Sequence, residues 1–364
     1  MALRSLDLSN ISDVIIYPFF ECNLKCKGCP VSEPLGGSGF LKSDPDEFKE
    51  HIEERHVERL LSWNVKNFII LGGEPFLSKY LPRILSTLNG KVIVYTNATL
   101  LYPTLSRYGL TDKLEAVLSL IDRLVISLEG QEDWTDKIRG KGVYRKAKYV
   151  IDYLVNKADS KLNLEIAVRM GYFEKNIGSV LRELRSLSDL NMSCILFPRI
   201  DQPPLDRNKV YQFYSIVASF DNADILLPSY KNFLGISNEG VTCPAGWNKV
   251  CLLPSGYLTP CQWYFRKVAH VDWDDHYIEQ AFTAWYRKMK KIKMECLGCK
   301  YAEVCMSSCM VAKDYLTCPV REGLQLEDKV KIDFYGEIRE VSKSKIVERV
   351  RKIGLIAHGC SAGC

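Results

Sequence analysis

The stretch CNLKCKGC, residues 22–29, stands shortly after the apolar, β-branched run VIIY at residues 14–17. Its cysteines, Cys22, Cys26 and Cys29, have the spacing C-x3-C-x2-C. Three closely spaced thiolates can hold three irons of a cubane [4Fe–4S] cluster, which normally takes four cysteine ligands. The missing ligand leaves one iron open to a small molecule. A structural zinc site is the alternative, but it needs a fourth ligand nearby.

Strand-like apolar runs alternate with helical patterns through the first two hundred residues. We predict strands near 14–20, 67–71, 91–96, 123–128, 163–169 and 193–198, and helices near 45–63, 78–89, 104–119, 143–157 and 173–189. Residues 43–46 (SDPD) offer the first helix an N-cap and an acidic first turn. Strands joined by helices form parallel βαβ units, so the pattern predicts an α/β fold.

Polar motifs follow three of these strands, where chemistry sits in such folds. The second strand runs into LGGEP (71–75), whose glycines permit close backbone approach and whose Glu74 can accept from an ammonium group. The third ends in TNATLL (96–101), and the fourth in SLEG (127–130) followed by DKIRGKG (136–142).

Together these motifs resemble the radical S-adenosylmethionine (SAM) enzymes. The resemblance implies a partial (β/α)6 barrel in which the open iron chelates SAM, and reduction of the cluster cleaves SAM to a 5′-deoxyadenosyl radical. It also implies that Ser127 and Arg139 bind the SAM carboxylate. For Arg139 the alternative is a solvated basic loop. The implied SAM contacts are Gly72, Gly73, Glu74, Pro75, Thr96, Asn97, Ser127 and Arg139.

A second cysteine block resembles the SPASM extension of that family. Its pattern is Cys243, Gly256-x4-Cys261, Cys296-x2-Cys299-x5-Cys305-x3-Cys309 and Cys318. The resemblance implies two auxiliary [4Fe–4S] clusters, three clusters in all. One would be held by Cys296, Cys299, Cys305 and Cys318, and the other by Cys243, Cys261 and Cys309 with Cys251 as fourth ligand. A cluster in which cysteine binds all four irons is expected to serve electron transfer. The alternatives are zinc for the block and a buried thiol for Cys251.

These blocks predict three parts of the chain: the barrel (1–220), the SPASM domain (221–325) and a C-terminal tail (326–364) with a strand-like stretch at 330–334. Cys194, inside a predicted strand, is expected to be a small buried hydrophobe. Cys360 and Cys364 end the chain, either as thiols on a mobile tail or as a redox pair, a metal-delivery pair or a cluster ligand.

Four departures from the family pattern are informative. Gly28 stands where an aromatic residue usually precedes the third cysteine, and Ala98 replaces a glycine. Gln262 replaces an aspartate that sulfatase-maturating relatives use as a base, which argues against that activity. Only 21 residues precede Cys22, too few for the leader-binding module of many relatives, so recognition of any leader is expected from a separate leader-binding protein or from the C-terminal tail.

Bulk properties agree with a cytoplasmic enzyme. The chain of 364 residues has 49 basic and 44 acidic residues, so its charge indicates no nucleic-acid partner. No apolar run reaches the roughly 18–20 residues of a membrane span, and the N-terminus lacks a secretory signal. Fourteen cysteines without secretion are better interpreted as metal ligands than as disulfides.

The predicted function is a radical SAM/SPASM oxidoreductase that modifies a peptide or protein, by a crosslink or a dehydrogenation. An external electron donor such as flavodoxin or ferredoxin is expected as a partner. Processing of tetrapyrrole side chains is an alternative, because relatives in the haem pathway share the same arrangement of cysteines. A non-catalytic iron–sulfur electron carrier is an alternative of another class, although a carrier has no need of SAM-binding motifs.

Overall fold

The computed structural model describes residues 6–29, 31, 47, 49–158, 162–190, 192–199, 202, 205, 207–225, 245–246, 248–262, 265–289, 329–334 and 337–342. The chain forms two compact units, one of residues 1–169 with 245–287 and one of residues 170–244 with 288–364. No helix among the described residues has the length and apolarity that crossing a membrane requires.

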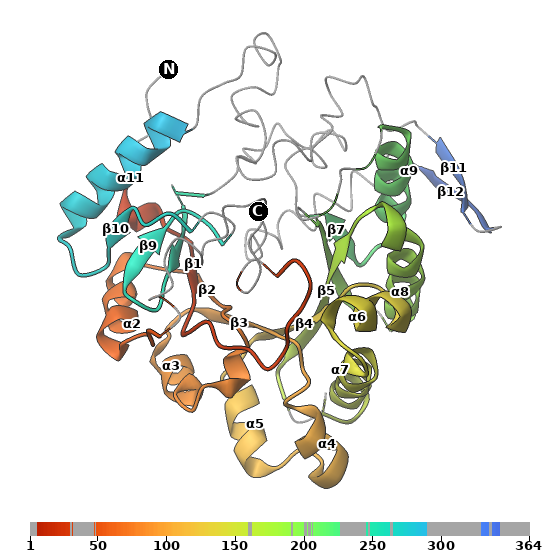
Figure 1. Ribbon diagram of the computed structural model, residues 1–364, viewed down its shortest axis with the longest axis horizontal. Coiled ribbons are helices and arrows are strands. Elements are labelled where there is room, and N and C mark those ends of the chain that lie inside the picture. Colours follow the sequence, from red (N-terminus) through yellow and green to blue (C-terminus); the bar gives the residue numbers. More distant parts are fainter. Residues whose placement is uncertain are drawn as a thin grey trace. The chain divides into compact units, whose positions relative to one another are not determined.

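The first unit is built on a parallel sheet (Figure 1). Four parallel neighbours form its centre: β1 (Asp13–Ile16), β2 (Asn67–Ile70), β3 (Lys91–Thr96) and β4 (Arg123–Leu128). Nearly every residue of these strands is buried. Parallel strands covered on both faces are expected to be continuously apolar, which explains the sequence runs that predicted them.

The sheet is extended on the far side of β1 by a segment from much later in the sequence. β8 (Lys249–Leu252) pairs parallel with β1, and β9 (Tyr257–Thr259) returns antiparallel to β8. β10 (Ala269–His270) pairs with β9. In register, Ile15 of β1 lies opposite Ile69 of β2 and opposite Cys251 of β8. β8, β9 and β10 therefore belong to the same sheet as β1, the strand that leads to residues 22–29.

Helices connect the strands and lie outside their arc in Figure 1. They are α2 (Glu54–Leu60), α3 (Leu81–Thr87), α4 (Tyr102–Tyr108), α5 (Asp112–Leu118), α6 (Glu132–Arg139), α7 (Val143–Tyr153) and α11 (Asp275–Met289). Single turns occur at Leu8–Asn10, Leu61–Trp63, Pro75–Leu77 and Leu154–Ala158.

The second unit contains another βα pattern and a separate hairpin. β5 (Glu165–Tyr172) passes from the first unit into it, and β6 (Ser193–Pro198) pairs parallel with β7 (Ala223–Ile225). Its helices are α8 (Ile177–Asp189) and α9 (Arg207–Ala218), with a short turn at Glu174–Asn176. β11 (Lys329–Phe334) and β12 (Glu337–Ser342) form an antiparallel pair, confirming the predicted strand at 330–334. Cys194 is buried in β6, as expected.

All six predicted strands are present, and the α/β fold is confirmed; two helical predictions need correction and one helix was missed. The helix expected over 45–63 begins at Glu54, because the chain before it is extended and Ile52 N–H donates to the Pro18 carbonyl at 2.9 Å. The proposed cap at 43–46 lies outside the described residues. The helix expected over 104–119 is two helices, since Gly109 at φ +69° ends α4 and Thr111 caps α5. Helix α6 had not been predicted.

Candidate cofactor site

The cysteines Cys22, Cys26 and Cys29 lie together in the loop that follows β1. All three are free thiols, and none is buried. Leu24 N–H donates to the Cys22 sulfur at 3.4 Å, and Cys29 N–H donates to the Cys26 carbonyl at 3.3 Å. Gly28 has φ +66°, a left-handed conformation that suits glycine, which accounts for a residue other than an aromatic here. We call residues 22–29 the cluster loop.

The Gly-Gly pair at 72–73 packs against the chain just before the cluster loop. A Cβ on Gly73 would lie 1.7 Å from the Glu21 carbonyl oxygen, and one on Gly72 would lie 2.7 Å from that of Phe19. Gly73 N–H donates to Phe19 O at 3.2 Å and Glu74 N–H donates to Glu21 O at 2.9 Å. The close approach expected of these glycines is therefore made to the protein's own backbone, and it fixes the cluster loop to the end of β2.

Glu74 is buried and ties the end of β2 to the end of β3. Its Oε1 accepts from the Thr96 hydroxyl at 2.7 Å and from Phe76 N–H at 3.2 Å, and its Oε2 accepts from Asn97 N–H at 2.8 Å. Burial raises the pKa of Glu74 above its ordinary value, an effect that these hydrogen bonds partly oppose. Both carboxylate oxygens thus position Thr96 and Asn97.

The end of β3 contacts the cluster loop through an amide network. Asn97 Nδ2 donates to Asn23 Oδ1 at 2.9 Å and lies 4.0 Å from the Cys22 sulfur, while Asn23 Nδ2 donates to Thr99 Oγ1 at 2.8 Å. Ala98, between them, is buried and has φ +61°. The alanine therefore keeps the left-handed backbone that the family's glycine would adopt. Asn23 was not predicted, although its place inside the cysteine motif was a signal.

The fourth strand end carries Ser127, and Glu129, which follows the strand, pairs with Arg139. Ser127 is buried at the end of β4. Arg139 Nη2 lies 2.7 Å from Glu129 Oε1, with 11% of the arginine side chain and 3% of the glutamate side chain exposed. Thr135 in α6 accepts from Glu129 N–H at 3.0 Å and donates to the Gly130 carbonyl at 2.8 Å, which holds the turn between β4 and α6. Arg139 is thus not in a solvated loop.

Helix α6 also holds the cluster loop, since Lys27 N–H donates to the Ile138 carbonyl at 2.9 Å. The loop therefore contacts the ends of β2 and β3 and the helix after β4. Of the predicted cofactor residues, the structure gathers Cys22, Gly73, Glu74, Thr96 and Asn97 through direct contacts around this loop.

A partly buried arginine near this site had not been predicted. Arg169 in β5 lies with its guanidinium carbon 5.9 Å from the centre of the Tyr95 ring. Burial lowers its pKa, while the charges of Tyr95 and Glu129 act in the opposite direction. Arginine is seldom buried unless paired. Its place within an otherwise apolar strand, IAVRMG at 166–171, was the signal that could have identified it.

Two cysteines of the second block, Cys251 and Cys261, are buried beside β1. Cys251 lies in β8 opposite Thr259, and Cys261 follows β9 after the turn at Gly256, whose φ of +83° requires glycine. Burial, and then the charge of Cys261, raise the pKa of Cys251 well above its ordinary value. The two thiols therefore interact. Cys243, Cys296, Cys299, Cys305, Cys309, Cys318, Cys360 and Cys364 lie outside the described residues.

The donor set in the cluster loop fits an iron–sulfur cluster. It consists of three soft sulfur donors, all free thiols, on a loop in which the Leu24 backbone N–H already donates to the Cys22 sulfur. The pKa of Cys22 is raised to about 11, chiefly because neighbouring atoms displace water from its sulfur although the residue as a whole is exposed. Iron would have to displace that proton, since the thiolate is the ligand.

Comparison with known proteins agrees with this geometry. Residues 16–167 match the model of the Radical SAM superfamily. That range runs from the end of β1 into β5 and contains the cluster loop and every motif described at the strand ends. No curated protein sequence matches the chain.

Solved structures share the fold at low sequence identity. SuiB of Streptococcus suis bound to S-adenosylmethionine is 16% identical, with a TM-score of 0.60 over 83% of this chain and 72% of that one. The protein anSMEcpe with bound AdoMet and a Cp18Cys peptide is 15% identical, with a TM-score of 0.58 over 95% of this chain and 98% of that one. Both comparisons identify the α/β architecture of a radical SAM barrel.

Proposed function

We propose that this protein is a radical SAM oxidoreductase of the SPASM type that modifies a peptide or protein side chain. The observation that carries the proposal is the convergence of the cluster loop, Glu74 and Asn97. A three-cysteine loop is fixed to two strand ends by glycine packing and amide contacts, inside a stretch that matches the Radical SAM superfamily. An iron–sulfur electron carrier has no use for this arrangement.

Cys22, Cys26 and Cys29 would hold the cluster, and the strand ends would hold SAM. When bound, the two together supply a 5′-deoxyadenosyl radical that removes a hydrogen atom from a carbon of the substrate. The backbone at 72–75, held by Glu74, would orient the amino group of SAM. Ser127 and Arg139 would bind its carboxylate: a guanidinium has five donors in a fork, so it can face Glu129 and a carboxylate together.

The substrate class rests on the fold comparison and the second cysteine block. One structure with this fold, anSMEcpe, was solved with AdoMet and a peptide bound together. Cys251 and Cys261, buried and interacting beside β1, supply two of the proposed auxiliary ligands. Loss of a hydrogen atom, then of one electron to an auxiliary cluster and one proton to a base, would leave the peptide oxidised by two electrons. Gln262 cannot be that base.

The experiment that tests the reaction class uses the anaerobically purified, cluster-loaded protein with SAM and a chemical reductant. The proposal expects 5′-deoxyadenosine, and none when either SAM or the reductant is omitted. Absence of 5′-deoxyadenosine from protein with a full iron content would contradict the reaction class and favour an electron carrier.

A second measurement tests the substrate class. Candidate peptides and porphyrinogens are added in parallel, and each product is examined by mass spectrometry. We expect a peptide, and no porphyrinogen, to accelerate 5′-deoxyadenosine formation and to lose the mass of two hydrogen atoms. Acceleration by a porphyrinogen with loss of its side-chain carboxylate would contradict the peptide assignment and leave the reaction class intact.

A further inference from the structure

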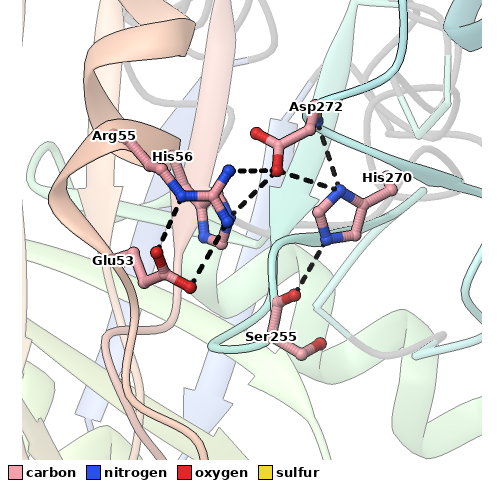
Figure 2. A network of polar contacts seen from close by, with 6 residues as sticks. All are labelled: Glu53, Arg55, His56, Ser255, His270 and Asp272. Carbon is pink, nitrogen blue, oxygen red and sulfur yellow. Dashed lines mark hydrogen bonds and ion pairs between the residues drawn. The ribbon is translucent and has the colours of Figure 1, made fainter.

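Two histidines and an aspartate converge on the side of the first unit, apart from the cluster loop. His56 comes from α2, His270 from β10, and Asp272 follows β10 (Figure 2). One ligating atom from each lies within 4.8 Å of the others. His56 Nε2 is 3.6 Å and His270 Nδ1 is 3.7 Å from Asp272 Oδ2. Segments more than two hundred residues apart in sequence thus place three metal-ligating side chains together.

His56 is the most informative of the three. The residue is 2% exposed, and neither ring nitrogen has a hydrogen-bond partner among the described residues. A buried polar group without a partner costs about 1–3 kcal/mol, so such groups in native proteins call for an explanation. Burial, and then the charge of Arg55, lower the pKa of His56.

The backbone at Gly256 leaves room for the two imidazole rings to lie close together. Their ring centres are 5.5 Å apart and the planes are nearly perpendicular, at 85°. Gly256 lies against both rings: a Cβ there would be 2.7 Å from His270 Nε2 and 2.7 Å from His56 Cε1. Any residue other than glycine would therefore separate the histidines.

His270 has the tautomer that a metal ligand needs. Its Nε2 is 3.0 Å from the Ser255 carbonyl oxygen, which can only accept, so Nε2 carries the proton and Nδ1 carries the lone pair. Nδ1 faces Asp272 and takes a long hydrogen bond, 3.3 Å, from the Asp272 backbone N–H. Histidine ligands almost always donate their other N–H to a carbonyl or carboxylate, as His270 does here.

Asp272 supplies the negative charge. Arg55 contacts Asp272 Oδ2 through Nη1 and also pairs with Glu53, with Nε 2.7 Å from Oε2 (Figure 2). Burial alone would raise the pKa of Asp272, but the Arg55 hydrogen bond and the charges of His56, Arg55 and His270 together hold it below its ordinary value. Glu53 balances Arg55, so the cluster keeps the charge of Asp272. A carboxylate has about four lone-pair sites and can accept from Arg55 while it ligates a cation.

We propose that His56, His270 and Asp272 bind a divalent transition-metal ion, with Zn²⁺ as the best match. Two imidazoles and one carboxylate are a common zinc set, and a water would complete the tetrahedron. Ligand atoms around tetrahedral zinc are about 3.3 Å apart at bond lengths near 2.0 Å, so the observed 3.6 and 3.7 Å need only small shifts. Asp272 is exposed and gives the ion a path of entry.

The ion would join α2 to the β9–β10 hairpin. The same segment of chain carries Cys251 in β8 and Cys261 after β9. A metal here would therefore fix the segment that supplies two proposed auxiliary-cluster ligands, without taking part in the radical chemistry. The inference depends only on side chains of the first unit and stands whether or not the proposed function is correct.

The test uses the cluster-loaded protein, treated with a chelator under anaerobic conditions and then titrated with Zn²⁺. We expect one zinc per chain beyond any zinc that the cysteine sites take up, and a rise of a few degrees in the unfolding temperature. X-ray absorption at the zinc edge should show that this additional ion has nitrogen and oxygen neighbours near 2.0 Å and no sulfur near 2.3 Å. An additional ion that is ligated by sulfur would overturn the proposal.

Three variants and one matched control complete the test. His270→Ala and Asp272→Asn, both on accessible side chains, should weaken zinc binding by at least roughly a hundredfold and abolish the thermal shift. His56→Ala should do the same if it folds. His276→Ala is the control, because His276 is exposed in α11 and contacts Gln280. Zinc binding that survives in both His270→Ala and Asp272→Asn would overturn the proposal, as would a wild-type protein that binds no zinc.

Discussion

Arg139, the last residue of α6, lies 2.7 Å from the buried Glu129 that follows β4, and 11% of the arginine side chain is exposed. Glu129 belongs to the SLEG motif, and Arg139 lies ten residues later in DKIRGKG. The sequence made Ser127 and Arg139, from these two stretches, candidate SAM contacts. The guanidinium therefore has a structural partner before any ligand is considered. A buried charge without its partner is strongly destabilising, so the proposed SAM contact of Arg139 would couple SAM binding to folding.

Replacement of Arg139 should consequently have two effects. Arg139→Ala leaves Glu129 buried and should lower the free energy of unfolding by about 3–5 kcal/mol. Arg139→Lys keeps the charge but loses the fork, and should reduce SAM affinity roughly ten- to a hundredfold with a smaller loss of stability. Chemical denaturation and SAM titration measure the two effects.

The matched control is Arg145→Ala, because Arg145 and Glu132 form an ion pair of similar length, 2.8 Å, between exposed side chains. That change should cost less than about 1 kcal/mol and leave SAM affinity unaltered. Undiminished SAM affinity in Arg139→Lys would limit Arg139 to its structural contact with Glu129.

Glu74 gives a prediction about pH. Burial raises its pKa in the folded state above the ordinary value of 4.5. Between these two values the folded protein binds more protons than the unfolded chain, so the stability due to Glu74 is fully present below pH 4.5 and is lost as pH rises through the folded pKa. The stability advantage of wild type over Glu74→Gln should therefore shrink from pH 4 to pH 7.

Glu53→Gln is the control of opposite sign, because the Arg55 hydrogen bond lowers the pKa of the exposed Glu53. Its contribution should fall as pH falls. Denaturation curves at several pH values compare the two variants, and an advantage over Glu74→Gln that grows with pH would show that the buried carboxylate is stabilised as the charged form.

Ala98 gives a prediction about backbone strain. A left-handed conformation destabilises a residue that has a Cβ by about 1–2 kcal/mol, and burial of the alanine methyl group offsets about 0.8 kcal/mol of this. Ala98→Gly should thus be neutral or stabilise by up to about 1 kcal/mol. Ala147→Gly, at an equally buried site within helix α7, should destabilise by about 2 kcal/mol. Equal losses in the two variants would show that Ala98 is not strained.

Much of the fold could be predicted from the sequence because its cause is local. The apolar runs at 67–71, 91–96 and 123–128 became β2, β3 and β4, since strands buried on both faces need continuous apolar residues. The break between α4 and α5 also has a local cause, because Gly109 ends the first helix and Thr111 caps the second. The helical pattern over 104–119 obscured this signal in the sequence. The helix start at Glu54 depends instead on a distant contact between Ile52 and Pro18.

The residue types of the site were predictable, and several of their contacts were not. The motif identified Gly72, Gly73 and Glu74, but only the structure shows that the glycines pack on residues 19–21 and that Glu74 positions Thr96 and Asn97. Pairing between β1 and β8 joins positions more than two hundred residues apart. No periodicity in the sequence could have placed Cys251 beside Ile15, or His56 beside His270.

The role of Cys251 distinguishes two hypotheses about the proposed auxiliary cluster near β1. If it completes a four-thiolate set with Cys243, Cys261 and Cys309, that cluster has no open iron and serves electron transfer. Cys251→Ala should then change the auxiliary-cluster spectra and lower the iron content. Cys194→Ala is the control, since Cys194 is also buried in a strand. Unaltered spectra in Cys251→Ala would return Cys251 to the role of a small core residue.

The most direct test of the radical SAM assignment replaces Cys22, Cys26 and Cys29 together by alanine. The triple variant should lose about four irons per chain, the content of one cubane cluster, and should make no 5′-deoxyadenosine after reduction. The proposed auxiliary clusters should keep their spectra, because Cys251 lies in β8 and Cys261 follows β9, and neither segment contains a replaced residue. A triple variant that still forms 5′-deoxyadenosine from SAM would contradict the assignment.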